Sequence, residues 1–141
     1  MLTTPHVLVA LVIISRLPNF AGLILALLSH FVLDFFIPHW NPHLYTEMSK
    51  NKKVSPNSIA IILVDGLIAV AFTLYFMMQK LPFFNQAFVV GLAAFLAVLP
   101  DFIEIPYYFL NYKAGWMVKY IEFEHQYQST GGFFWGLVTQ I

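Results

Sequence analysis

The sequence contains no cysteine and few charged residues. The absence of cysteine from its 141 residues excludes disulfide bonds and thiolate zinc sites. Only 10% of the residues are charged, against about 25% in soluble domains, whereas 60% are hydrophobic. Lys and Arg balance Asp and Glu at seven each, so no excess positive charge exists to neutralise the phosphates of a nucleic acid. We therefore expect a single-domain integral membrane protein without a nucleic-acid partner.

The apolar segments predict an all-α fold, an integral membrane bundle of four to five short helices arranged as two hairpins within a single domain, 1–141. The first hairpin covers about 5–37 and the second about 56–110, joined by a polar loop, 38–55. An interfacial and re-entrant tail covers 111–141. Thr4-Pro5 and Ser55-Pro56 each predict a helix start, with an N-cap followed by proline. The first helix is too short to span a ~30 Å membrane core, whereas the second is long enough.

The distribution of basic residues predicts the orientation. The face that carries the long loop holds most of the Lys and Arg residues, namely Lys50, Lys52, Lys53, Lys113 and Lys119, while Arg16 and Lys80 lie on the other face. The positive-inside rule then makes the long-loop face cytoplasmic. The N-terminus lacks a basic n-region and a small-residue cleavage site, so we expect no cleaved signal peptide.

Several titratable residues lie inside the apolar segments. A charge at the centre of a membrane helix costs about 2.5–3.5 kcal/mol, so these side chains need an explanation. His6 and His30 are equally far from the turn of the first hairpin, which places both imidazoles at one level. Asp65 and Asp101 are level in the second hairpin by the same reasoning. All four are expected toward the long-loop side of the membrane.

Spacing within the helices indicates a shared site. His30 and Asp34 are at i and i+4, and Asp101 and Glu104 are at i and i+3, so each pair shares a helix face. Imidazoles with carboxylates suit Zn²⁺, or Mn²⁺ and Fe where carboxylates dominate. The candidate metal ligands are His6, His30, Asp34, His39, Asp65 and Asp101, and the candidate catalytic residues are Asp65, Glu104 and His125.

Simpler interpretations remain open for single residues. A lone histidine in a membrane helix most often donates a hydrogen bond between helices, which is the better interpretation of His6 taken by itself. Asp65 alone is explained by a protonated carboxyl bonded across helices. Glu122 and Glu124 are expected on a solvated face rather than as ligands. The pair His30 and Asp34, taken with Asp65 and Asp101, makes four costly groups at one depth and favours a functional site.

The segment Ser29-His30-Phe31-Val32-Leu33-Asp34 resembles the motif S-H-x-x-x-D of a bacterial and archaeal family, the membrane-bound metal-dependent hydrolases of the LexA-regulated inner-membrane protein type. The resemblance implies that His6 matches the family's N-terminal histidine, and Asp65 and Asp101 its later acidic positions. His125 stands in for a later histidine motif, H-R-x-x-T-H-S, whose paired histidines are absent here. The family implies a hydrolase in the cytoplasmic (inner) membrane of a prokaryote.

The expected function is therefore metal-dependent hydrolysis of a membrane lipid or lipid-linked (phospho)ester by a metal-activated water. One alternative is a transporter component that handles ions or protons, which predicts a polar path to both faces. Another is a small structural or assembly subunit with a structural metal. The sequence leaves the metal, the substrate and the oligomeric state open, including a homo-oligomer or a subunit of a complex.

Overall fold

A computed structural model gives the structure of residues 1–140, and within this range the regular structure is entirely helical. The prediction of an all-α chain is confirmed. The helices are α1 (Thr3–Arg16), α2 (Phe20–Phe36), α3 (Leu44–Asn51), α4 (Pro56–Met78), α5 (Phe84–Leu110), α6 (Gly115–Tyr127) and α7 (Phe133–Val138).

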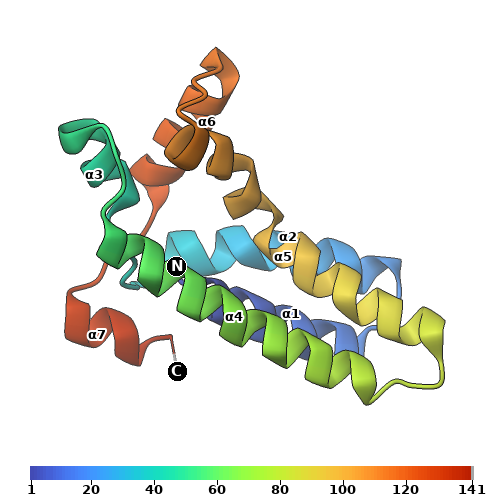
Figure 1. Cartoon of the computed structure of the whole chain (residues 1–141). Helices are drawn as coiled ribbons and strands as arrows, with labels where there is room; N and C mark the ends of the chain where they lie inside the picture. The colour runs from blue at the N-terminus through green and yellow to red at the C-terminus, as the bar shows by residue number, and fades with distance from the viewer. Residues whose placement is uncertain (141) are drawn as a thin grey trace.

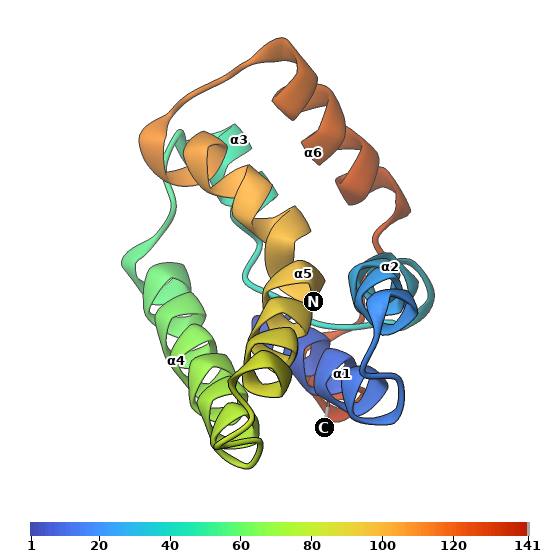
Figure 2. The same cartoon turned by 90° about the vertical axis from the view of Figure 1, so that its right-hand side faces the viewer.

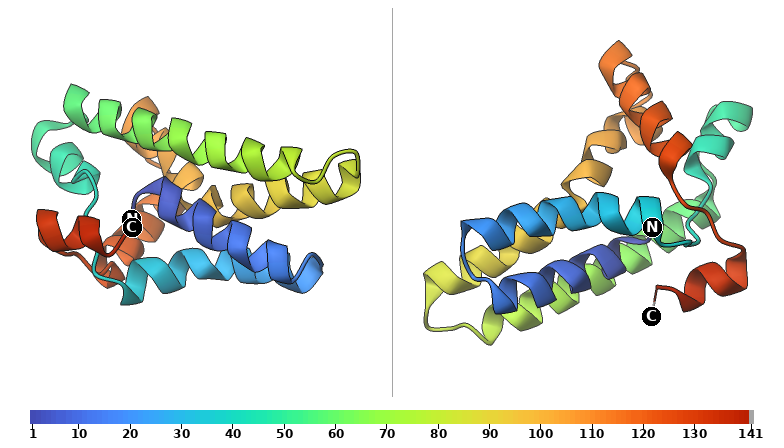
Figure 3. Two further views of the ribbon diagram at one scale, coloured as in Figure 1. Left: turned by 90° about the horizontal axis from the view of Figure 1, so that it is seen from below. Right: turned by 180° about the vertical axis from the view of Figure 1, so that it is seen from behind.

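The four longest apolar helices form two antiparallel pairs, α1 with α2 and α4 with α5 (Figure 1). Both hairpin turns lie at one end of the bundle, and α3, α6 and α7 gather at the other end (Figure 3). Helix α1 packs against α2, α4 and α5. Its buried Ala10, Leu11 and Ile14 meet small residues such as Ala93 and Ala97 of α5, which let the helices approach closely.

The starts of α1 and α4 are capped differently. Ser55 caps α4 as predicted, because its hydroxyl oxygen accepts a hydrogen bond from the amide of Ser58 at 3.2 Å. The prediction that Thr4 caps α1 is wrong, because the helix already begins at Thr3 and its N-cap residue Leu2 offers no side-chain acceptor. The carboxylate of Asp65 on α4 accepts the amide N–H of Thr3 instead, at 2.5 Å. A remote side chain thus satisfies the free donors of the first turn.

Helix α5 continues through Pro100 and Pro106 but bends away from the bundle in its second half (Figure 1). Proline lacks an N–H and its ring clashes with the carbonyl one turn earlier, which opens the helix locally. The chain then reverses at 111–114, and α6 runs back toward the end of α2 (Figure 2). The bend thereby separates the arm made by α5 and α6 from the four-helix bundle.

The loop predicted at 38–55 contains a helix, α3, and the tail contains α6 and α7. Glu47 on α3 fixes the start of α4, because its carboxylate accepts hydrogen bonds from the amide of Ser55 at 2.7 Å and from the hydroxyl of Ser58 at 2.8 Å. A second small core holds α3, α5 and α6 together through Met48, Tyr108, Met117 and Ile121.

Two helices, α4 and α5, are long and apolar enough to cross a membrane. The expectation that the second helix is also long enough is wrong, because α2 has 17 residues and a length of roughly 26 Å. Only 11% of the apolar window of α4 is buried in the protein, and Leu63, Leu67 and Val70 are more than half exposed.

Candidate metal centre

Three histidines meet at the end of the bundle opposite the hairpin turns. His6 comes from α1, His30 from α2, and His39 from the segment that follows α2, and their exposed fractions are 0%, 0% and 1%. The rings of His6 and His30 stack with their centroids 4.2 Å apart. The equal spacing of these two residues from the first turn therefore predicted their meeting correctly.

The carboxylate of Asp34, 4% exposed, lies among the three imidazoles. Its Oδ1 is 3.2 Å from Nε2 of His6 and 3.8 Å from Nε2 of His39. Its Oδ2 is 3.6 Å from Nε2 of His30. The α-amino group of Met1 donates a hydrogen bond to Oδ1 at 2.8 Å. The ammonium thus balances the charge of Asp34 but leaves the Nε2 atoms of the three imidazoles without hydrogen-bond partners.

Backbone carbonyls fix the orientation of two of the rings. Nδ1 of His30 donates to the carbonyl of Ala97 at 2.9 Å, and Nδ1 of His39 donates to the carbonyl of Ile37 at 2.8 Å. A carbonyl only accepts, so Nδ1 carries the proton and Nε2 of the neutral ring presents a lone pair. Ala97 lies in the turn before Pro100, so the bend of α5 and the orientation of His30 arise at the same place.

The Nε2 atoms of His6, His30 and His39 are buried and have no hydrogen-bond partner. Burial, with a smaller effect of the nearby α-amino charge, lowers the pKa of His39 to about 4, so this ring is neutral near pH 7. The Nε2 lone pairs of His30 and His39 repel a carboxylate that faces them, and buried unpaired polar atoms are costly. A cation between these atoms removes both penalties, and histidines whose Nδ1 binds a carbonyl are typical metal ligands.

Two further carboxylates approach His30. Its Nε2 lies 4.0 Å from Oδ1 of Asp101 on α5 and 3.8 Å from Oε1 of Glu124 on α6. His6, His30 and Asp101 each offer a ligand atom within 4.8 Å of the others, a group that can hold a metal ion.

Glu124 was expected on a solvated face, but its side chain is 12% exposed. Burial raises the pKa of this carboxyl, and the hydroxyl of Tyr120 donates a hydrogen bond to it. The sequence did hold a signal for this position. Met117, Ile121 and Glu124 follow one another at helical spacing on one face of α6, and the first two residues are buried.

The separations fit one shared ion. In a tetrahedral zinc site with bonds of about 2.0–2.1 Å, neighbouring ligand atoms lie roughly 3.3 Å apart. The contacts of Asp34 with His6 and His30, at 3.2 and 3.6 Å, are close to this edge length. The donor set of imidazole nitrogen and carboxylate oxygen is also the one that zinc takes.

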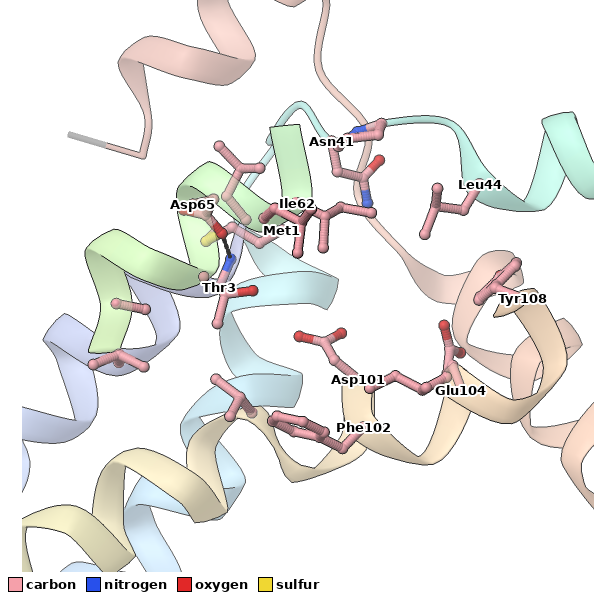
Figure 4. A pocket seen from close by; sticks show the side chains of 18 of the residues that line it. Met1, Thr3, Asn41, Leu44, Ile62, Asp65, Asp101, Phe102, Glu104 and Tyr108 are labelled. Carbon is pink, nitrogen blue, oxygen red and sulfur yellow. Dashed lines mark hydrogen bonds between the residues drawn. The ribbon is translucent and has the colours of Figure 1, made fainter. Parts of the chain in front are cut away.

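The remaining predicted site residues lie outside this cluster. Asp65 caps α1, accepting the amides of Thr3 and Thr4, so its carboxylate is already satisfied (Figure 4). Glu104 is one turn after Asp101, and both side chains point into the same cavity (Figure 4). His125 is exposed and stacks on the ring of Tyr45 with centroids 4.0 Å apart, at the edge of that cavity. Its neighbour Glu124 faces His30 instead.

A cavity of about 630 Å³ adjoins the cluster, between α4, α5 and α6. Its lining includes apolar side chains such as Leu67, Val70 and Phe95 and the carboxylates of Asp101, Glu104 and Glu124. In the part of the chain that the structure describes, no Lys or Arg lines it. The lining therefore suits a ligand that has both an apolar chain and a polar group.

No family model, curated protein or solved structure matches the chain. The resemblance to membrane-bound metal-dependent hydrolases therefore stays a prediction from the motif at His30 and Asp34.

Proposed function

We propose that the protein is a metal-dependent hydrolase of a membrane lipid or lipid-linked (phospho)ester. The observation that carries the proposal is the set of three buried, unpartnered imidazole nitrogens around Asp34, beside a cavity with apolar walls. A divalent cation would be held by His6, His30, His39, Asp34 and Asp101. Zinc is the first candidate, and Mn or Fe are the alternatives.

The exposed apolar surface supports a location in the membrane. Leu67 on α4 is 70% exposed, and Leu63 and Leu74 on the same helix are 61% and 52% exposed. An apolar surface of this extent is unfavourable in water but matches lipid. We place the protein in the cytoplasmic membrane of a prokaryote, with the cluster on the cytoplasmic side, following the motif and the basic residues of the long-loop face.

The carboxylates that line the cavity support a role in hydrolysis. A divalent cation bound there would supply a Lewis acid and lower the pKa of water to about 7. Glu104 is in position to accept or return a proton, because it shares a helix face with Asp101 and points into the cavity. The apolar walls would hold the acyl or isoprenoid chain of the substrate.

The test is turnover of the purified protein in mixed micelles with a fluorescent diacyl phospholipid and a fluorescent acyl ester. We expect hydrolysis of at least one probe, its loss with EDTA, and its return with Zn²⁺ or Mn²⁺. Glu104→Gln should reduce turnover by about 10²–10⁴-fold while the metal is retained. Glu122→Gln, which changes an exposed carboxylate on α6, is the matched control.

A metal-loaded protein with no turnover on either probe would contradict the proposal and favour a structural subunit. Metal or proton flux across liposomes that hold the protein, again without turnover, would favour a transporter component. Turnover that is unaffected by EDTA and by His30→Ala would also overturn the proposal.

A further inference from the structure

A long apolar groove runs between α4 and α5. The two helices meet at their hairpin turn and diverge toward the other end of the bundle (Figure 1 and Figure 2). Part of the cavity of about 630 Å³ lies between them, and its lining residues on α4 extend from Ile62 to Leu74. At 1.5 Å per residue this stretch is roughly 18 Å long. One leaflet of a ~30 Å hydrocarbon core is about 15 Å thick, so the groove is as long as one layer of lipid chains.

The groove has a buried floor and an exposed rim. Its floor includes Ala69 on α4 and Ala94 on α5, which are both buried. Leu67 and Val70 on α4 and Phe95 on α5 also line the cavity, although all three are exposed. Residues that line a cavity and are exposed as well stand at its opening. Because α4 and α5 are the two helices long and apolar enough to cross a membrane, this opening would face the lipid chains.

The order of residues along α5 gives the groove a direction. From Gly91 to Val98 the lining residues of this helix are apolar, and its first carboxylate in the lining is that of Asp101. Asp101 also belongs, with His6 and His30, to the group that can hold a metal ion. The groove therefore leads from an apolar stretch near the hairpin turn to the candidate metal centre.

Gly66 leaves the groove open. It lies on the same face of α4 as the lining residues Ile62 and Val70, one turn away on either side. A Cβ added at Gly66 would meet nothing within 4 Å. A larger side chain at this position would therefore fill the groove without striking another helix.

We infer that this groove binds one acyl chain of a bilayer lipid, which enters sideways from the membrane between α4 and α5. The end of the chain lies near the hairpin turn, and its ester group lies beside Asp101. The inference rests on the proposed function. It adds the route by which the lipid enters, the direction of its chain and the role of Gly66 as the residue that leaves room for it.

An acyl chain suits this groove better than a helix from a second copy of the protein. An empty gap between lipid-facing helices loses van der Waals contacts, so chains of the surrounding lipid fill it. An apolar helix in the same place would bury the carboxylates of Asp101 and Glu104, which line the cavity, without partners. A lipid instead places its polar ester group beside these carboxylates, where the proposed cation would bind it.

The experiment is photolabelling of the full chain in phosphatidylcholine vesicles. Two phospholipid probes carry a diazirine, one at the end of an acyl chain and the other next to its ester group, and mass spectrometry locates the adducts. We expect adducts of the chain-end probe near Leu74 and Gly91, and adducts of the ester-side probe near Asp101 and Phe102. Even labelling of all exposed apolar helix faces, or the reverse order along the groove, would overturn the inference.

A variant of the groove tests the role of Gly66. Gly66→Phe should lower labelling of the groove by about tenfold or more, the lower end of the effect that one misfitting methylene has in an apolar pocket. Gly115→Phe on α6 is the matched control, because its added Cβ also meets nothing within 4 Å and, among the described residues, Gly115 is not part of the lining. The control should be labelled as the wild type is. Unchanged labelling of a folded Gly66→Phe variant would overturn the inference.

The outcomes separate this inference from the proposed function. Groove labelling that persists in His30→Ala, with no turnover of lipid probes by the wild type, would support the lipid groove and overturn the hydrolase. Turnover together with even labelling would leave the hydrolase standing and overturn the groove. A dimer that excludes both probes from the groove would also overturn it, in favour of a second copy. The labelling pattern of the wild type needs no variant, so it decides the question even if Gly66→Phe fails to fold.

Discussion

Gly136 on α7 packs against the backbone of His39, one of the proposed metal ligands. The backbone around His39 is held by the tail, because its amide donates to the carbonyl of Ser129 at 3.1 Å and the amide of Trp40 donates to the carbonyl of Gly136 at 3.2 Å. A Cβ added at Gly136 would lie 2.5 Å from the nitrogen of Trp40 and 2.8 Å from the carbonyl carbon of His39. We therefore predict that Gly136→Ala displaces His39.

The size of the displacement follows from these distances. Ordinary contact begins at 3.4 Å, so the backbone must retreat from 2.5 to 3.4 Å, or by about 0.9 Å. Metal–ligand distances tolerate about 0.2 Å. Disturbing the groups that orient a ligand typically lowers metal affinity by about 10–100-fold. That range corresponds to about 1.4–2.8 kcal/mol of binding free energy.

The assay is calorimetric titration of the metal-free protein with Zn²⁺. Gly132→Ala is the matched control, because it changes the N-cap residue of the same helix and its added Cβ meets nothing within 4 Å. We expect the control to bind as the wild type and Gly136→Ala to bind about 10–100-fold more weakly. Equal affinity of both folded variants would refute the argument that the tail positions His39 as a ligand.

Three other variants test separate parts of the account. Asp65→Ala should lower the free energy of unfolding by about 0.5–2 kcal/mol, as loss of a helix cap does, and leave zinc affinity unchanged. A loss of zinc affinity in calorimetry would contradict the capping role. Leu67→Arg on the exposed face of α4 should make the free energy of membrane insertion about 2.5–3.5 kcal/mol less favourable in a translocon assay. Insertion at the wild-type level would count against a lipid-facing helix. For Glu47, burial raises the pKa, but hydrogen bonds from Ser55 and Ser58 outweigh it and hold the pKa below 4.5. The stabilisation by Glu47 is therefore present above pH 4.5 and lost as the pH falls through the folded-state pKa. The melting temperatures of the wild type and of Glu47→Gln should therefore converge in acid. A difference between the two melting temperatures that stays constant with pH would refute the role of these hydrogen bonds.

The sequence predicted the helical hairpins and the meeting of His6 with His30 because both depend on distance from a turn. His30 and Asp34 followed from helical spacing alone. Asp65 was predicted as a ligand from its depth, but depth does not specify direction, and the free amides of α1 offered its carboxylate another partner. Glu124 was missed because its position depends on the bend of α5, which brings α6 back to α2.

The helices within the predicted loop and tail were missed for a related reason. Helix α3 is short and polar, and it is stabilised by contacts of Glu47 and Met48 that are distant in sequence. Short helices are marginal without tertiary packing, so local sequence gives little signal for them. His39 was predicted as a ligand, but its anchoring by the tail depends on long-range backbone hydrogen bonds.

The proposed metal site can be tested by anomalous X-ray scattering from crystals of the full chain grown with Zn²⁺, recorded on both sides of the zinc absorption edge. We expect strong anomalous density between the carboxylate of Asp34 and the Nε2 atoms of His6 and His30. Absence of that density, with the imidazoles hydrogen-bonded to one another or to water, would contradict it.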